Sequence, residues 1–234
     1  MKKYRFLILT LVFTLLGSTV IYAGVRLRSS TDVYLALKED VFYPKNVEKD
    51  CKLPVVFLSH NGGQDKAAWG DFPQQIADAG FFTVNISWQA WDTSQVEAAI
   101  NYTLEKYKDK IDTNRVAFVG GCHGGKDLLQ IMGRQDLTYK VKTAVVLSVS
   151  EDDQPVVDSQ KTGHGPILAY YSLHDVLGEY YQQVTKRVAE EIITEPKKAV
   201  ALDESAHGDD LVTQASCKVE LRRDIINWLK LYDK

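Results

Sequence analysis

The stretch that decides the fold is RVAFVGGCHGGKDLLQIM, residues 115–132. Residues 115–120 form an apolar run of the kind found in strands that are buried on both faces of a parallel sheet. Residues 126–132 have a helical pattern, and the glycines between the two segments indicate a sharp turn. Small residues on both sides of Cys122 allow it to occupy a strained strand-to-helix turn as a nucleophile. The positive end of the helix that follows would stabilise a thiolate there.

Strand and helix patterns alternate in both directions from this turn. We expect strands at 53–59, 81–88, 115–120, 142–149, 166–171 and 198–202, with one or two short strands within 32–43. We expect helices at 69–79, 93–107, 126–132, 180–193 and 210–231. Such alternation indicates a mostly parallel central sheet flanked by helices, and ligands bind beyond the carboxyl ends of its strands.

The GGCHGG segment resembles the nucleophile elbow of the α/β-hydrolase superfamily, in which serine usually occupies the position of Cys122. Cysteine at this position is typical of the dienelactone hydrolase branch, to which the region is similar. The resemblance covers most of residues 32–234 in the order of elements, and it implies one α/β-hydrolase domain over 24–234. About 16 residues separate the strands expected at 142–149 and 166–171, so no large cap domain is expected. An open site of this kind favours a small or flexible substrate.

The remaining catalytic roles follow from the chain order of the superfamily, which is nucleophile, acid and histidine. The resemblance assigns the acid to Asp175 and the histidine to His207, each of which follows a late strand. Asp175 would orient the imidazole, and His207 would accept the thiol proton and later protonate the leaving group. Asp203 and Glu179 are alternative acids, and His164 is a much weaker alternative for the histidine.

The segment His60-Asn61-Gly62-Gly63 resembles the HGGG oxyanion loop of the superfamily, with Asn61 in place of the first glycine. The resemblance assigns the oxyanion donors to the backbone N–H groups of Gly62, with Gly63 close behind, and of His123. A plain strand-to-helix turn is the alternative interpretation of this segment.

Two further observations bear on the site. Lys126 and Asp127 occupy a helix that is usually apolar in the superfamily, and an acid at this place would oppose thiolate formation. Trp88 and Trp91 flank a loop at the carboxyl end of a strand, where they would line the pocket, pack in the core or lie exposed on the surface.

These features predict hydrolysis of a carboxylic ester, lactone or thioester through an acyl-enzyme, with a small-molecule acyl substrate and no cofactor. Acyl transfer would use the same residues. The competing hypothesis is an inactive α/β-hydrolase that serves as a binding or scaffold protein, which the cysteine at position 122 favours slightly. A metal-dependent hydrolase is disfavoured because the sequence has no ligand-spaced clusters of His, Asp or Glu. The net charge of −3 provides no basic patch for nucleic acid.

Residues 1–23 have the pattern of a leader, with three cations followed by an apolar run and a cleavage point before Gly24. We expect a cleaved signal peptide or an uncleaved membrane anchor, and therefore a periplasmic or secreted protein. Three cysteines in an exported protein leave open either a Cys51–Cys217 disulfide or free thiols.

Overall fold

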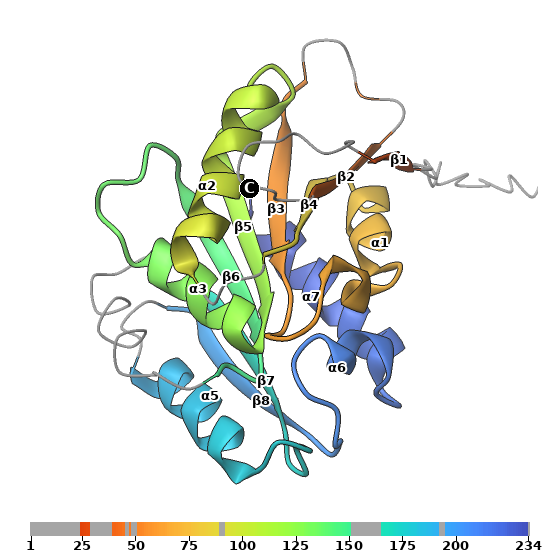
Figure 1. Cartoon of the computed structure of the whole chain (residues 1–234), viewed down its shortest axis with the longest axis vertical. Helices are drawn as coiled ribbons and strands as arrows, with labels where there is room; N and C mark the ends of the chain where they lie inside the picture. The colour runs from red at the N-terminus through yellow and green to blue at the C-terminus, as the bar shows by residue number, and fades with distance from the viewer. Residues whose placement is uncertain are drawn as a thin grey trace, which may run out of the picture.

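The computed structural model describes residues 24–28, 39–44, 47, 51–88, 92–150, 165–191 and 195–233 of the 234-residue chain (Figure 1). The strands are β1 (Gly24–Arg28), β2 (Glu39–Pro44), β3 (Leu53–Ser59), β4 (Phe82–Ile86), β5 (Ile111–Gly121), β6 (Val141–Leu147), β7 (Ile167–Ser172) and β8 (Lys197–Leu202). The helices are the 3-10 helix η1 (Lys66–Trp69) and the α-helices α1 (Phe72–Asp78), α2 (Thr93–Lys106), α3 (Cys122–Met132), α5 (Glu179–Glu191), α6 (Asp210–Thr213) and α7 (Lys218–Tyr232).

The eight strands form one sheet in the order β1-β2-β4-β3-β5-β6-β7-β8. Strand β2 pairs antiparallel with both β1 and β4, and every other pair is parallel. The prediction of a mostly parallel sheet flanked by helices is therefore confirmed. The chain leaves β3 for β4 on one side and returns to β5 on the other. The carboxyl ends of β3 and β5 are thus a topological switch point, where ligands bind in open α/β sheets.

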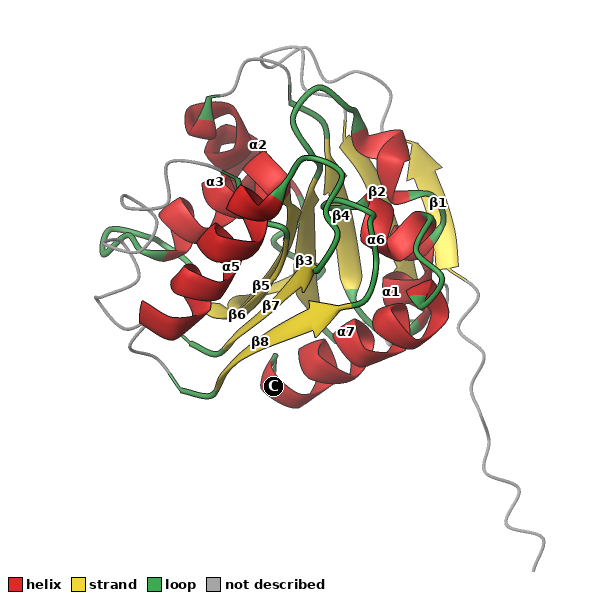
Figure 2. Ribbon diagram, turned by 90° about the horizontal axis from the view of Figure 1, so that it is seen from below, coloured by secondary structure: helices red, strands yellow, loops and turns green. Residues whose placement is uncertain are grey.

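Helices cover both faces of the sheet, with α2, α3 and α5 on one face and α1, α6 and α7 on the other (Figure 2). Alternate residues of β3 enter opposite layers of the core, since successive side chains of a strand point to opposite faces. Val55 and Phe57 pack in the first layer, and Val56 and Leu58 pack in the second. Burial on both faces explains why the central strands are continuous apolar runs in the sequence.

Several element boundaries differ from the sequence predictions. Strand β1 is an additional strand, and the helix predicted at 69–79 is η1 followed by α1. Helix α3 begins at Cys122, since the glycines permit helical backbone directly after the turn. The helix predicted at 210–231 is divided into α6 and α7. At the break, the carboxylate of Glu204 accepts hydrogen bonds from the Ser216 hydroxyl and from the Cys217 N–H (3.1 Å), which ends the run of helical hydrogen bonds.

Several sequence predictions fall outside the described residues, namely those on the leader, on Trp91 and on His164. Among the described residues no helix combines the length and the hydropathy needed to span a membrane. The disulfide that the sequence left open is not formed, because Cys51 and Cys217 are both free thiols. Cys51 precedes β3 at the amino edge of the sheet, whereas Cys217 caps the start of α7 near the carboxyl edge.

The first turn of α3 lies directly against the end of β3, and Gly124 makes this contact possible. A Cβ atom on Gly124 would lie 2.5 Å from the carbonyl oxygen of His60 and 2.5 Å from the carbonyl carbon of Ser59. Both atoms belong to the backbone, so neither can move without displacing the strand. The contact holds the start of α3 beside the loop that follows β3.

We expect Gly124→Ala to lower the free energy of unfolding by about 3 kcal/mol, because the added methyl group forces two backbone segments apart. Gly63→Ala is the matched control. Gly63 has a φ of 77° but no atom within 4 Å of the added Cβ, so its substitution should cost only about 1 kcal/mol of backbone strain. Urea unfolding followed by far-UV circular dichroism measures both values. Equal losses for the two variants would contradict the close contact.

Candidate active site

Cys122 is the residue at which β5 gives way to α3, and its backbone is strained. Its φ is 49°, in the left-handed region that residues with a side chain rarely adopt. Such strain costs on the order of 1–3 kcal/mol and persists only where the surrounding structure enforces it, most often at functional sites. The turn has the strand-turn-helix geometry of a nucleophile elbow. A buried structural cysteine would have no need of this conformation.

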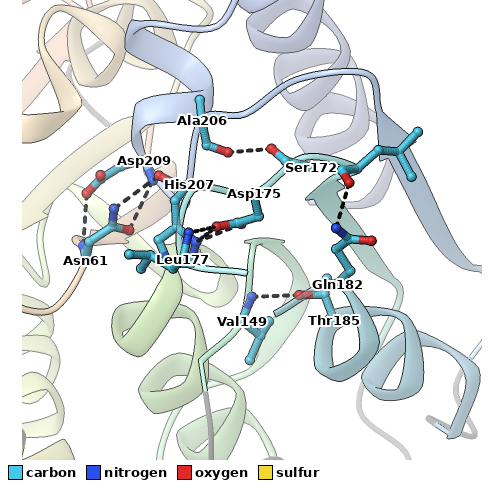
Figure 3. Close-up of polar contacts among 11 residues, drawn as sticks. Asn61, Val149, Ser172, Asp175, Leu177, Gln182, Thr185, Ala206, His207 and Asp209 are labelled. Carbon is cyan, nitrogen blue, oxygen red and sulfur yellow. Dashed lines mark hydrogen bonds and ion pairs between the residues drawn. The ribbon is translucent and has the colours of Figure 1, made fainter. Parts of the chain in front are cut away.

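His207 and Asp175 form a buried pair at the carboxyl edge of the sheet (Figure 3). The Nδ1 atom of His207 lies 2.8 Å from Oδ2 and 3.0 Å from Oδ1 of Asp175. A carboxylate accepts hydrogen bonds, so Nδ1 carries a proton and Nε2 is the atom that can exchange one. Nε2 is buried and has no hydrogen-bond partner of normal geometry among the described residues.

The structure distinguishes among the three acids considered from the sequence. Asp203 pairs with His174 on the surface, where its Oδ1 lies 3.0 Å from the imidazole Nε2. Glu179 is the first residue of α5. In the described structure Asp175 is the one of the three that is hydrogen-bonded to His207. His174 is thereby a surface histidine, in contrast to the buried His207.

The charge state of His207 depends on two opposing influences. Burial lowers its pKa, but the hydrogen bond with Asp175 and the neighbouring Cys122 side chain raise it, and the net result is a pKa of about 9. The imidazolium form is therefore favoured at neutral pH. A positive charge beside Cys122 stabilises negative charge on the sulfur, as a thiol nucleophile requires.

The turn that carries Asp175 and the loop that carries His207 are joined along their length. Three backbone hydrogen bonds of 2.8–3.0 Å connect residues 173–176 to residues 202–205. The Ser172 hydroxyl donates to the carbonyl of Ala206. The ring of Tyr181 packs edge-on against the His207 imidazole, with 4.5 Å between centroids. These contacts fix the position of the imidazole relative to its acid.

His60 supports the loop after β3. Its Nδ1 lies 2.7 Å from the carbonyl oxygen of Asn61, and its Nε2 accepts a hydrogen bond of 3.3 Å from the backbone N–H of Trp88. These partners require a neutral imidazole with the proton on Nδ1, and burial lowers the pKa of His60 accordingly. Trp88 stacks on this ring at 4.9 Å and donates its indole N–H to Ser59. Trp88 is therefore a core residue beneath the loop.

The two predicted oxyanion donors lie directly after neighbouring strands, β3 and β5, at the switch point. Gly62 belongs to the turn that follows β3, and His123 is the second residue of α3, after β5. Ser59 and Gly120 are opposite each other in the β3–β5 pair, so both loops emerge at the same place. Backbone N–H groups of a first helical turn point toward the helix N-terminus, which is the direction that an oxyanion hole at Cys122 needs.

Asp127 is fully buried, one turn below the elbow. It faces α2, because the hydroxyl of Thr93 donates to its Oδ1 at 2.7 Å and Lys126 Nζ lies 4.0 Å from the same oxygen. Burial raises the pKa of Asp127, and the hydrogen bond from Thr93 and the charge of Lys126 oppose this shift.

One polar pair at this edge was missed by the sequence analysis. Asp209 is fully buried and accepts a hydrogen bond of 2.9 Å from the backbone N–H of Asn61. The only signal in the sequence was an acid two residues after His207, and an acid just before a helix is more simply interpreted as a cap. Asp209 makes no such side-chain cap for α6.

The raised pKa of His207 makes a contribution to stability that depends on pH. Because the folded value of about 9 exceeds the ordinary value of 6.5, this contribution is complete below about pH 6.5 and is lost as pH rises through 9. We expect the free energy of unfolding of the wild type to fall over this window relative to His207→Gln. Urea unfolding at several pH values measures the difference, in which the contributions of titrating groups that do not interact with His207 cancel. Parallel profiles for the two proteins would contradict the raised pKa.

Solved structures of several hydrolases resemble this chain. Dienelactone hydrolase from Anabaena variabilis superposes with a TM-score of 0.71 at 15% identity, covering 90% of this chain and 99% of that one. Esterase B from Lactobacillus rhamnosis gives a TM-score of 0.67 at 12% identity, covering 91% and 87%. An esterase from the fungus Rhizomucor miehei gives 0.68 at 16% identity, covering 90% and 83%.

No protein-family model matches the chain, and no curated protein matches its sequence. The likeness to these structures is therefore a likeness of fold, carried by the order of strands and helices over nine-tenths of the chain. It agrees with the resemblance in the sequence around Cys122. The chain has the α/β-hydrolase fold.

Proposed function

We propose that this protein is an exported hydrolase that cleaves a carboxylic ester, lactone or thioester through Cys122, His207 and Asp175. The observation that carries the proposal is a strained cysteine at a strand-to-helix turn, at the same edge of the sheet as a buried histidine–aspartate pair. The fold shared with a dienelactone hydrolase and esterases supports the reaction class. The leader at residues 1–23 supports export.

Acylation begins when His207 Nε2 takes the proton of the Cys122 thiol and the sulfur forms a bond to the substrate carbonyl carbon. The π electrons of the carbonyl move to its oxygen, which the backbone N–H groups of Gly62 and His123 stabilise. When this intermediate collapses, the bond to the leaving group breaks and the leaving group takes a proton from His207 Nε2. The product of this half-reaction is a thioester on Cys122.

Deacylation uses the same groups in the opposite sense. Neutral His207 accepts a proton from water, whose oxygen attacks the thioester carbon. Collapse of the second intermediate breaks the bond to sulfur and releases the carboxylic acid. Asp175 remains ionised throughout and stabilises the imidazolium each time it forms. Transfer of the acyl group to an alcohol or amine would follow the same steps with another acceptor in place of water.

We expect Cys122→Ala to abolish hydrolysis of p-nitrophenyl butyrate, and His207→Ala to lower kcat by at least about 10³-fold. His174→Ala, which alters an exposed histidine, and Cys217→Ala are the matched controls, and both should leave the rate unchanged. The assay uses purified residues 24–234 before and after iodoacetamide. An inactive wild type with an unreactive Cys122 would instead support a binding protein on a hydrolase scaffold.

The surroundings of Asp175 suggest the class of substrate. Six large apolar side chains are exposed in the described residues, and four of them lie within residues 173–180. They are Leu173, Val176, Leu177 and Tyr180, with exposed fractions of 44–69%. This apolar turn adjoins the catalytic pair, since the Leu177 N–H donates to Asp175 at 2.9 Å (Figure 3). Exposed apolar patches of this kind mark binding surfaces, and we propose that this one receives an apolar acyl or alkyl group.

We expect Leu177→Ser to lower kcat/KM for p-nitrophenyl hexanoate by about tenfold, since partial burial of a leucine side chain contributes about 1.5 kcal/mol. The value for p-nitrophenyl acetate should change little because its short acyl group does not reach the turn. Val219→Ser removes another exposed apolar side chain, on α7, and serves as the control. Equal effects of Leu177→Ser on both esters would show that the apolar turn does not bind substrate.

A further inference from the structure

Asn61 and Asp209 lie 148 positions apart in the sequence and are paired through reciprocal hydrogen bonds (Figure 3). The backbone N–H of Asn61 donates to Oδ2 of Asp209 at 2.9 Å, and the backbone N–H of Asp209 donates to Oδ1 of Asn61 at 3.1 Å. A third bond, of 3.2 Å, runs from the Asn61 side-chain amide to the carbonyl oxygen of His207. All three bonds are buried.

The backbone around the pair is shaped to accommodate the amide of Asn61. Gly208 has a φ of 56°, and a Cβ atom there would lie 2.6 Å from Cγ of Asn61. The residue between His207 and Asp209 therefore has to be glycine for the asparagine side chain to fit. On the opposite side, the carbonyl of Asn61 is held by Nδ1 of the buried His60.

Asp209 occupies this place at an energetic cost. Its Oδ1 is buried with no hydrogen-bond partner among the described residues, and such a group is expensive to remove from water. Burial raises the pKa of Asp209 to about 7, although the Asn61 N–H and the His207 charge oppose the shift. An apolar side chain at position 209 would stabilise the fold more than this carboxyl does. A buried carboxyl that connects two loops of a candidate site indicates a role in the site itself.

We propose that Asn61 and Asp209 are positioning residues. They hold the oxyanion loop at 61–63 and the His207 imidazole at fixed positions relative to each other, on either side of Cys122. This inference rests on the proposed function. The two loops follow different strands, β3 and β8, and the pair is a direct connection between them. If the connection is lost, the oxyanion donors and the proton acceptor no longer reach the same reacting carbonyl group together.

The test measures kcat and KM for p-nitrophenyl butyrate in Asn61→Ala, Asp209→Ala and the double variant. Misplacement of catalytic groups by about 1 Å costs about 10²-fold in rate, so we expect each single variant to lose about that factor in kcat with little change in KM. Asn61→Ala removes the two bonds that the asparagine side chain makes, and Asp209→Ala removes the bond to the Asn61 N–H. The double variant lacks all three bonds and should therefore lose more kcat than either single variant. A folded double variant that keeps the wild-type kcat would overturn the proposal.

Two further variants separate positioning from folding. Asp209→Asn keeps an oxygen that can accept from the Asn61 N–H, so it should restore kcat to within about tenfold of the wild type. Thr213→Val removes only a hydrogen bond of 3.3 Å to the Asp209 carbonyl, and its activity should be unchanged. Urea unfolding verifies that each variant is folded in the assay. If Asn61→Ala does not fold, the comparison of Asp209→Ala with Asp209→Asn decides.

The outcomes distinguish this inference from the proposed function. An active wild type whose kcat is unaffected by Asn61→Ala and Asp209→Ala would overturn the positioning role alone. Failure of Asp209→Asn to restore kcat in a folded protein would do the same. A wild type that shows no turnover, or turnover that survives Cys122→Ala, would overturn the proposed function and the positioning role together.

Discussion

The backbone of α3 touches the carbonyl groups at the end of β3, and the arrangement of the candidate site depends on this contact. Gly124 is the residue that permits it, because any side chain there would overlap the main chain of Ser59 and His60. The contact has two consequences. It places the positive end of α3 beside the loop that follows β3, and it forces the chain to turn sharply at Cys122. A strained cysteine and a neighbouring set of backbone donors thus arise from one packing constraint.

Several buried titratable groups lie at the carboxyl edge of the sheet. The sheet is buried on both faces, yet its carboxyl edge carries the buried side chains of His60, Asp127, Asp175, His207 and Asp209. Such groups destabilise a fold unless they are paired. Here most are hydrogen-bonded to one another or to loop backbone, and the bonds connect loops that follow β3, β7 and β8. The polar network thereby fixes the relative positions of loops that the sheet itself leaves free.

His60 and His207 illustrate how the surroundings of a histidine determine its charge state. His60 and His207 are both buried, and burial alone lowers the pKa of each. His60 faces a carbonyl and a backbone N–H, so it remains neutral and serves as a support for the loop. His207 faces a carboxylate and a thiol, so its pKa is raised to about 9 and its second nitrogen is available for proton transfer. The hydrogen-bond partners, and not the degree of burial, determine which of the two imidazoles is neutral and which is charged.

Local patterns in the sequence determined the alternation of strands and helices, the parallel sheet and the turn at Cys122, because apolar periodicity and the spacing of small residues are read over a few neighbouring positions. The features that depend on contacts between distant segments were decided by the tertiary structure alone. It selected Asp175 over Asp203 as the partner of His207, placed Trp88 in the core and divided the last predicted helix at a bond to Glu204. It also brought Asn61 to Asp209 across 148 positions. Hydrogen bonds between the side chains of different loops follow no repeating pattern along the chain, so no local pattern in the sequence could have predicted them.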